Sequence, residues 1–278
     1  MHRYLFLTAT IGLLLLAAPC ALATGEPAGE AAVRTDVPAG RDGGDGRTPD
    51  QAGPESASAP LPQAGVLEDL RGMVTARQDG GEPRSLCKDA PVFVSDILAT
   101  GPADKGKVVF ADDSVLEIGP DSEVHIAEFA YDTTDRDNFR QGIRMAKGLF
   151  RYATGKIVAH DPARLHMESP LASIGIRGTT TDHLIQVREE ITDGKPERIV
   201  ETELHALRQS KAKTEVVVTH LNKPVSLKKE DAAASLAPKK PAVTRPLTAD
   251  EKKIFAEIPL SPAPFDPRPG SSLLGGGQ

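Results

Sequence analysis

Through the middle of the chain, apolar residues recur at every second position. This alternation is found at residues 108–110, 116–118, 124–126, 165–167, 172–176 and 216–218. Turn-forming sequences such as Asp112-Asp113-Ser114 and Gly119-Pro120-Asp121-Ser122 separate the first of these segments. A period of two with short intervening turns predicts β-strands. The predicted fold class is therefore all-β, with short strands in a sandwich, a roll or a short solenoid, because these architectures share the same rhythm.

One segment near the C-terminus has the pattern of a helix. Thr248 and Glu251 are spaced as a capping box, in which each side chain satisfies a backbone amide of the other residue. Pro259 marks the end of the segment, because proline cannot continue a helix. We therefore expect one short helix at 248–258, packed on the β-domain through three apolar residues: Ile254, Phe255 and Ile258.

The first residues have the layout of a secretory signal peptide. The apolar run from Leu5 to Ala18 is shorter than the roughly 20 residues that span a bilayer. Ala21-Leu22-Ala23 follows, a small-x-small pattern that signal peptidase cuts after. We predict that residues 1–23 are a signal peptide and that the protein is periplasmic or secreted after cleavage near Ala23. Lipidation at Cys20 and an uncleaved signal anchor are the two alternatives.

Shifts in composition divide the rest of the chain. The segment after the signal peptide is rich in Gly, Pro, Ala, Ser and Asp. It has too few apolar positions to offset the entropy of ordering it. The last residues repeat proline and glycine in the same way. The predicted organisation is a disordered leader at 24–64, the main β domain at 65–188, a β-rich extension at 189–236 and a Pro-rich tail with the short helix at 237–278.

Charge and cysteine content limit the partners and the covalent structure. The formal net charge is −6, which gives the chain no electrostatic reason to bind nucleic acid. Apart from the N-terminal run, no segment is long and apolar enough to cross a membrane, so the mature chain is predicted to have no transmembrane segment. Of the two cysteines, Cys20 would leave with the signal peptide and Cys87 would remain. The mature chain is therefore expected to have no intramolecular disulfide.

Three stretches of the sequence carry recognisable motifs. The first joins Gly72-x-Val74 to residues 94–101, which end in Thr-Gly. The second, residues 111–120, has an Asp-Asp-Ser turn, an apolar strand and Gly-Pro. The third, residues 169–179, contains Ile-Arg-Gly-Thr. Together they resemble the FecR domain, the periplasmic module of iron-citrate-type signalling proteins, from about residue 66 to 187, and Ile-Arg-Gly-Thr is close to the signature of that family.

The resemblance implies a sensing or docking module whose partner is an envelope protein or an unknown ligand. Its candidate binding residues are those of the signature loop, Arg177, Gly178 and Thr179. Gly175 and Gly178 bracket Arg177, which favours a bend or a close strand approach at this point. The guanidinium of Arg177 either anchors that bend or binds the partner. The family's signalling members carry an anti-sigma segment and a membrane helix ahead of this domain; we recognise neither here, so the resemblance does not extend to direct control of a sigma factor.

Two positions depart from the family pattern. Asp113 stands where the family prefers glycine, and we expect its backbone to be left-handed. Thr181 and His183 stand where apolar residues are usual, which predicts a more polar face on this strand. Adjacent strand residues point to opposite faces, so Asp182 and His183 are not expected to share one site. A structural role is favoured for His183 over a role as a ligand or proton acceptor.

The sequence contains no recognisable catalytic motif. We find no Gly-x-Ser-x-Gly elbow, no His-Glu-x-x-His and no phosphate-binding loop. The histidines at 125, 160, 166, 183, 205 and 220 lack the spacing of metal ligands. No catalytic residue, metal site or cofactor is therefore predicted, and the protein is predicted not to be an enzyme.

Three functions remain to be compared. The favoured one is an exported FecR-domain protein that binds a ligand or another protein, with envelope signal sensing as its wider role. Its mode of binding would be pairing of a partner strand with a sheet edge. The alternative is a structural or assembly component of the cell wall or matrix, suggested by the long polar tails. A hydrolase of unfamiliar type is the third, motivated only by residues 179–183.

Overall fold

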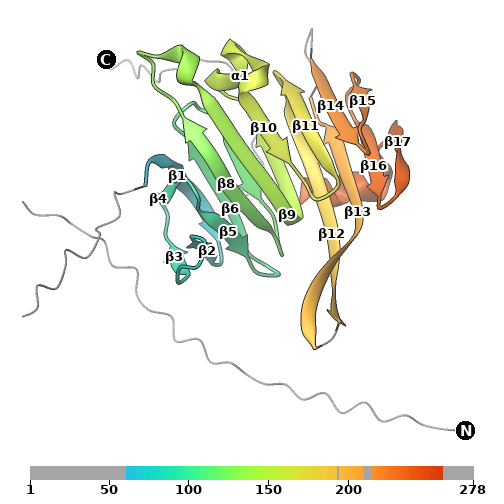
Figure 1. Ribbon diagram of the computed structural model, residues 1–278, viewed down its shortest axis with the longest axis horizontal. Helices are drawn as coiled ribbons and strands as arrows, with labels where there is room; N and C mark the ends of the chain where they lie inside the picture. Colours follow the sequence, from blue (N-terminus) through green and yellow to red (C-terminus); the bar gives the residue numbers. More distant parts are fainter. Residues whose placement is uncertain (1–60, 193, 210–213, 259–278) are drawn as a thin grey trace, which may run out of the picture. The chain divides into compact units, whose positions relative to one another are not determined.

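The computed structural model describes residues 61–192, 194–209 and 214–258 (Figure 1). The chain divides into two units, Met1–Ala59 and Pro60–Gln278, and all described residues belong to the second. The described residues of this unit form 17 strands and short helical segments. The predicted all-β class with a short C-terminal helix is confirmed. The helical segments are α1 (Lys156–His160), α2 (Ala249–Ala256) and the 3₁₀ turns η1 (Arg136–Asn138) and η2 (Pro162–Arg164).

The strands form two sheets. Sheet 1 runs from edge to edge as β4 (Ala90–Phe93), β1 (Gln63–Arg71), β6 (Lys105–Phe110), β7 (Val115–Ile118), β9 (Arg140–Ala153), β12 (Thr180–Thr192), β13 (Lys195–Leu207), β16 (Ala232–Ala237) and β17 (Lys240–Pro246). Sheet 2 runs as β3 (Arg84–Leu86), β2 (Val74–Arg77), β5 (Ile97–Thr100), β8 (Glu123–Ala130), β9, β10 (Leu165–Glu168), β11 (Ala172–Arg177), β14 (Glu215–His220) and β15 (Lys223–Leu227).

Strand β9 belongs to both sheets. Its first part, residues 140–147, pairs with β8, and residues 141–144 also pair in parallel with β10. Its second part, residues 148–153, pairs with β12 in sheet 1. The change of sheet falls at Gly148, whose φ of +105° and close approach to Ser122 both require glycine: an added Cβ would lie 2.4 Å from the Ser122 Cα. All other strand pairings among the described residues are antiparallel.

The core lies where the two sheets face each other. Alternate residues of β6 and β14 are buried, and β11 shows the same alternation, as the sequence pattern predicted. A Cβ added to Gly106 of sheet 1 would lie 3.1 Å from the side chain of Val74 in sheet 2. Phe110 and Phe129, one from each sheet, stack with ring centroids 5.6 Å apart. The period-two pattern therefore reports on the inner faces of a two-layer β structure.

Helix α2 covers part of the outer face of sheet 1. Its N-terminus has the predicted capping box between Thr248 and Glu251. Phe255 and Ile258 are fully buried, but Ile254 is 40% exposed, so the prediction of a buried side was wrong for that residue. The helix buries its apolar side in a second, smaller cluster with residues of sheet 1 and the segment before the helix: Leu149, Leu204, Ala206, Ala233 and Leu247.

A buried aspartate fixes the turn between β6 and β7. The Asp112 carboxylate accepts hydrogen bonds from the backbone amide and hydroxyl of Ser114, at 3.1 and 2.6 Å. It also accepts a bond of 3.2 Å from the amide of Ile157 at the start of α1. Asp113 has a φ of +63°, which confirms the predicted left-handed backbone. The turn is thereby tied to α1, a helix that the sequence pattern did not predict.

Two further expectations concern the covalent structure and the membrane. Cys87 is disulfide-bonded in the structure of the uncleaved sequence. The expectation of no intramolecular disulfide concerned the mature chain without residues 1–23, and it stays a prediction. Within the described part of the chain, neither α-helix has the length and apolar character needed to span a bilayer. The predicted signal peptide, most of the leader and the end of the tail lie outside the described residues.

Candidate functional site

Four polar side chains form a hydrogen-bonded row on β12 and β13. Thr181 and His183 share one face of β12, and Glu203 and His205 share the same face of β13. The Thr181 Oγ1 lies 2.8 Å from the His183 Nε2. The two histidines meet through their Nδ1 atoms at 3.0 Å, and the His205 Nε2 lies 3.1 Å from the Glu203 Oε2. We call these residues the Thr-His-His-Glu row.

The row is closed to solvent. All four side chains lie in the buried interior, at 0 or 1% exposure. Burial, with a further contribution from His205, holds the pKa of His183 well below its usual value, so that this ring is neutral. One consistent pattern of donors then runs along the row, from Thr181 through His183 and His205 to the Glu203 carboxylate. A substrate has no access to it, and the geometry supports a structural role for His183.

Asp182 points to the opposite face, as predicted. Its carboxylate is buried and accepts two hydrogen bonds from Arg151, at 2.6 and 2.9 Å. The same guanidinium donates to the backbone carbonyl of Phe255 in α2, at 3.0 Å. Asp182 and His183 therefore serve different faces of sheet 1, and Asp182 helps to hold the helix.

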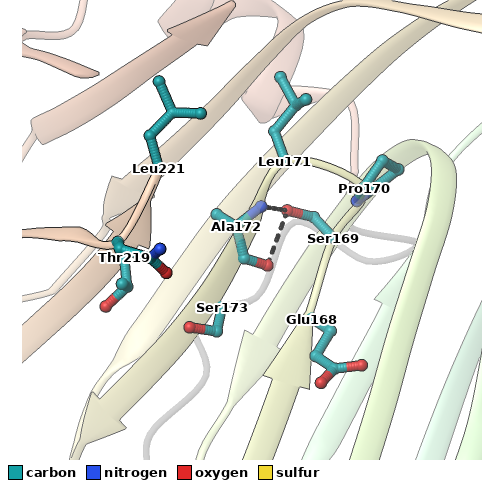
Figure 2. A pocket seen from close by; sticks show the side chains of 9 residues that line it. Glu168, Ser169, Pro170, Leu171, Ala172, Ser173, Thr219 and Leu221 are labelled. Carbon is teal, nitrogen blue, oxygen red and sulfur yellow. Dashed lines mark hydrogen bonds between the residues drawn. The ribbon is translucent and has the colours of Figure 1, made fainter. Parts of the chain in front are cut away.

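The far end of the row supports a turn in sheet 2. Glu203 accepts a hydrogen bond of 2.6 Å from the Ser169 hydroxyl and one of 2.9 Å from the Leu171 amide. The Leu171 carbonyl is in turn 2.7 Å from the Nδ1 of buried His220. The Ser169 hydroxyl also bonds the backbone of Ala172, as Figure 2 shows. The turn between β10 and β11 is thus held from inside the protein by polar contacts.

This turn forms one wall of a shallow groove on the outer face of sheet 2. Two adjoining depressions, of about 350 and 280 Å³, lie along β10, β11 and β14. The groove exists because β11 turns only Ser173 and Gly175 outward over this stretch, and both side chains are small. We call it the β11 groove; its lining residues are Leu165–Ser173, Ile174, Gly175, Val217, Thr219, Leu221 and Asn222, most of which appear in Figure 2.

The predicted binding residues, Arg177, Gly178 and Thr179, come directly after the groove residues along the chain. Arg177 is the next outward residue of β11 after Gly175, and it is exposed. It pairs across the ladder with Glu215, but within the described part of the structure its side chain makes no hydrogen bond or ion pair. The pKa of Glu215 is lowered by hydrogen bonds from Ser226 and Lys228, and Arg177 adds a smaller effect in the same direction.

Gly178 and Thr179 carry the chain from sheet 2 to sheet 1. Gly178 has a φ of +59°, a left-handed conformation that favours glycine, and nothing lies within 4 Å of where a Cβ would be. Thr179 is buried, and its hydroxyl donates to the carbonyl of Gln209. Gly175 lies in regular strand pairing with Val217, so the expected bend is at Gly178 alone. Of the three predicted residues, only Arg177 presents its side chain to solvent.

The sequence did not reveal the groove itself. Ser169, Ser173 and Gly175 lie within the recognised third motif, but Thr219 and Asn222 come from a distant hairpin that the ladder brings alongside. The available signal was the pair of small residues at alternate positions of the third motif, Ser173 and Gly175. No cluster of three or more His, Cys, Asp or Glu side chains with metal-binding geometry occurs in the described parts of the chain.

Comparison with known families identifies this region. Residues 96–220, from just before β5 to the end of β14, match the family described as FecR protein. The match contains the Thr-His-His-Glu row, Arg177 and the lining residues of the β11 groove other than Leu221 and Asn222. The resemblance to the FecR family drawn from the sequence motifs is thereby confirmed over residues 96–220.

Solved structures add a distant likeness. Two crystal structures of a candidate anti-sigma factor from Parabacteroides distasonis ATCC 8503 each have a TM-score of 0.39 and 9% sequence identity to the chain. Each alignment covers 56% of this chain and 62% of that chain, so the chain spans about three fifths of their length. No curated protein matches the sequence.

Proposed function

We propose that this protein is a non-enzymatic, exported FecR-domain module that binds an envelope protein or ligand through the β11 groove and Arg177. The carrying observation is that Arg177, part of the Ile-Arg-Gly-Thr signature, is an exposed guanidinium in line with the groove floor. A guanidinium that makes no hydrogen bond with the described residues of its own chain is available to a carboxylate or carbonyl of a partner.

The character of the groove favours an extended peptide segment. Its floor is formed by small residues and by Val217 and Thr219, and hydroxyl groups stand along it. The turn that forms one wall is fixed by Glu203 and His220, so little ordering is required when a ligand binds. A peptide lying along β11 would place an acidic residue or a chain terminus beside Arg177. The Thr-His-His-Glu row is buried and offers no accessible groove for a substrate, which supports binding over hydrolysis.

The proposed place of action is outside the cytoplasm. The support is the signal-peptide pattern of residues 1–23 together with the FecR match, since the resemblance implies a periplasmic module. Binding there would connect an external event to a signalling partner in the envelope.

The test is affinity capture of the protein from its own cell envelope with matched variants. Arg177→Ala should lose the specific partner, whereas Arg140→Ala, which removes another exposed arginine of sheet 2, should retain it. Gly175→Val fills the groove floor; the added Cβ would lie 3.9 Å from the Val217 carbonyl, so the fold tolerates it while binding is lost. A partner retained equally by all variants would contradict the proposed site.

The structural or assembly role in the cell wall remains the second candidate. No Phe or Tyr lines the β11 groove in the described structure, and the sequence has no Trp, so the ring stacking common in glycan sites has no support there. Cosedimentation with purified wall material distinguishes the two roles. Sedimentation with the wall that Arg177→Ala does not alter would favour the structural role.

A further inference from the structure

The outer edges of both sheets are poorly suited to strand addition. Proline lies in or directly before each edge strand: Pro83 before β3, Pro91 in β4, Pro224 in β15, and Pro241 and Pro246 in β17. Proline has no amide hydrogen and interrupts a ladder, and natural edge strands use it to prevent association. The partner-strand mode expected from the sequence therefore has little support at these four edges.

One strand edge lacks this protection. β9 pairs with β12 only as far as Ile185 and then bends into sheet 2 at Gly148. Beyond that point, Gln186–Thr192 has β13 as its one ladder partner among the described strands. Figure 1 shows the end of the β12–β13 hairpin running past the neighbouring strands. This segment contains neither proline nor glycine, so its unpaired backbone groups form a continuous row.

The free part of the hairpin is anchored to sheet 2 near its middle, where Arg198 lies opposite Glu189 in the ladder. Arg198 donates two hydrogen bonds to the Glu123 carboxylate of β8, at 3.0 and 2.9 Å. This contact is the largest cause of the lowered pKa of Glu123, whose side chain is only 17% exposed. The Gln186–Thr192 segment is therefore already ordered before a partner binds, which reduces the conformational entropy lost on pairing with a partner strand.

We propose that the Gln186–Thr192 edge pairs with the same edge of a second copy of this chain, antiparallel and centred on Glu189. In this register, Arg188 lies opposite Glu190 of the second copy, and the two-fold symmetry repeats that pair. Val187 lies opposite Ile191 of the second copy, which gives a neighbour to an isoleucine that is 78% exposed.

The charges of the edge residues agree with this register. Arg188 and Glu190 form an ion pair of 3.1 Å within the strand, and Arg188 also lies 3.5 Å from Glu201. Both groups are still 53 and 48% exposed, so each can also reach a neighbour at the edge. Glu189 would meet its own counterpart, but Arg198 lies 3.9 Å from it in the same hairpin and offsets the like charge. Centring the pairing on Glu190 instead would place Glu189 opposite Ile191 and remove both Arg-Glu pairs. The Glu189 register is thus the self-complementary one.

The test exchanges the charges at positions 188 and 190 and measures the dimer by sedimentation velocity. The protein is expressed from the full sequence in bacteria and is purified as the cells process it. Arg188→Glu sets the introduced carboxylate against Glu190 of the other copy, and Glu190→Arg sets the introduced guanidinium against Arg188. Each single variant should dimerise at least about tenfold more weakly than the parent, since two attractive pairs become repulsive. An equimolar mixture of the two variants should restore dimers, because in a mixed dimer two carboxylates of one copy face two guanidinium groups of the other.

The control is Lys253→Glu on α2, which is equally a surface charge reversal and should leave the dimer unchanged. Two short strands bury less than the roughly 1,600 Å² of a standard interface, so the dimer should populate only at high protein concentration. A parent chain that stays monomeric there would overturn the proposal. Dimers that persist in both single variants, or a mixture that stays monomeric, would do the same. Loss of partner capture by Arg177→Ala tests the proposed function separately.

Discussion

Acid should destabilise this protein through the Thr-His-His-Glu row. His183 is fully buried and its pKa is well below the usual value, whereas in the unfolded chain a histidine has a pKa of about 6.5. Above that value neither state binds the proton, and the full stability is present. As the pH falls below about 6.5, the unfolded chain takes up a proton that the folded protein excludes, and stability is lost.

The size of the effect follows from this linkage. One histidine whose folded pKa lies far below 6.5 contributes a loss of about 2 kcal/mol between pH 7 and pH 5. With a typical urea dependence of about 2 kcal/mol per molar, the unfolding midpoint should fall by about 1 M from this group alone. The chain has no Trp, so far-UV circular dichroism is the suitable signal for the titration.

The comparison variant is His183→Gln. A glutamine amide can accept from Thr181 and donate to His205, but it does not titrate. Other groups, including His205, Glu203 and the partly exposed His125, remain in both proteins, so the difference between their pH dependences isolates His183. The variant should lose less stability between pH 7 and pH 5 by about 2 kcal/mol. Equal losses in the two proteins would refute the assignment.

Three other outcomes are expected. Phe255→Ala should cost about 3 to 5 kcal/mol in urea unfolding, because it empties the fully buried centre of the cluster under α2. Gly178→Ala should cost about 1 kcal/mol, from the left-handed backbone alone, whereas Gly155→Ala should cost more, because the added Cβ would lie 2.4 Å from the Asp112 carbonyl oxygen. Mass spectrometry of the exported protein should give an N-terminus at Thr24; a mass that includes residues 1–23 would contradict cleavage.

Local features of the fold could be predicted from the sequence. The strands at 108–110 and 172–176 appear with the expected alternation, because burial on one face of a strand imposes a period of two. The capping box at Thr248 and the left-handed Asp113 were also predictable, since each depends on contacts within a few residues. Helix α1 was missed because five residues are too few to show a helical period.

Features that depend on register could not be predicted in this way. His183 and His205 are 22 residues apart, and only the pairing of β12 with β13 brings their rings together. The groove likewise requires β14 to lie beside β11, which no local pattern specifies. Arg177 was selected from a motif. The structure adds that its two neighbours in the signature loop serve the fold, Gly178 through its left-handed backbone and Thr179 through its buried side chain. Ile254 was misassigned because α2 meets the sheet through Phe255 and Ile258 instead.

The sharing of β9 between the sheets has a consequence for how this protein unfolds and how it can be divided. Since residues 140–147 pair in sheet 2 and residues 148–153 pair in sheet 1, neither sheet can melt without releasing a strand from the other. We expect one cooperative transition for the described part of the chain, with no separable half. A fragment limited to residues 96–220 would keep β9 but lose β1, the neighbour of β6, and β16, the neighbour of β13. The part that the family match defines is therefore smaller than the part that must fold together.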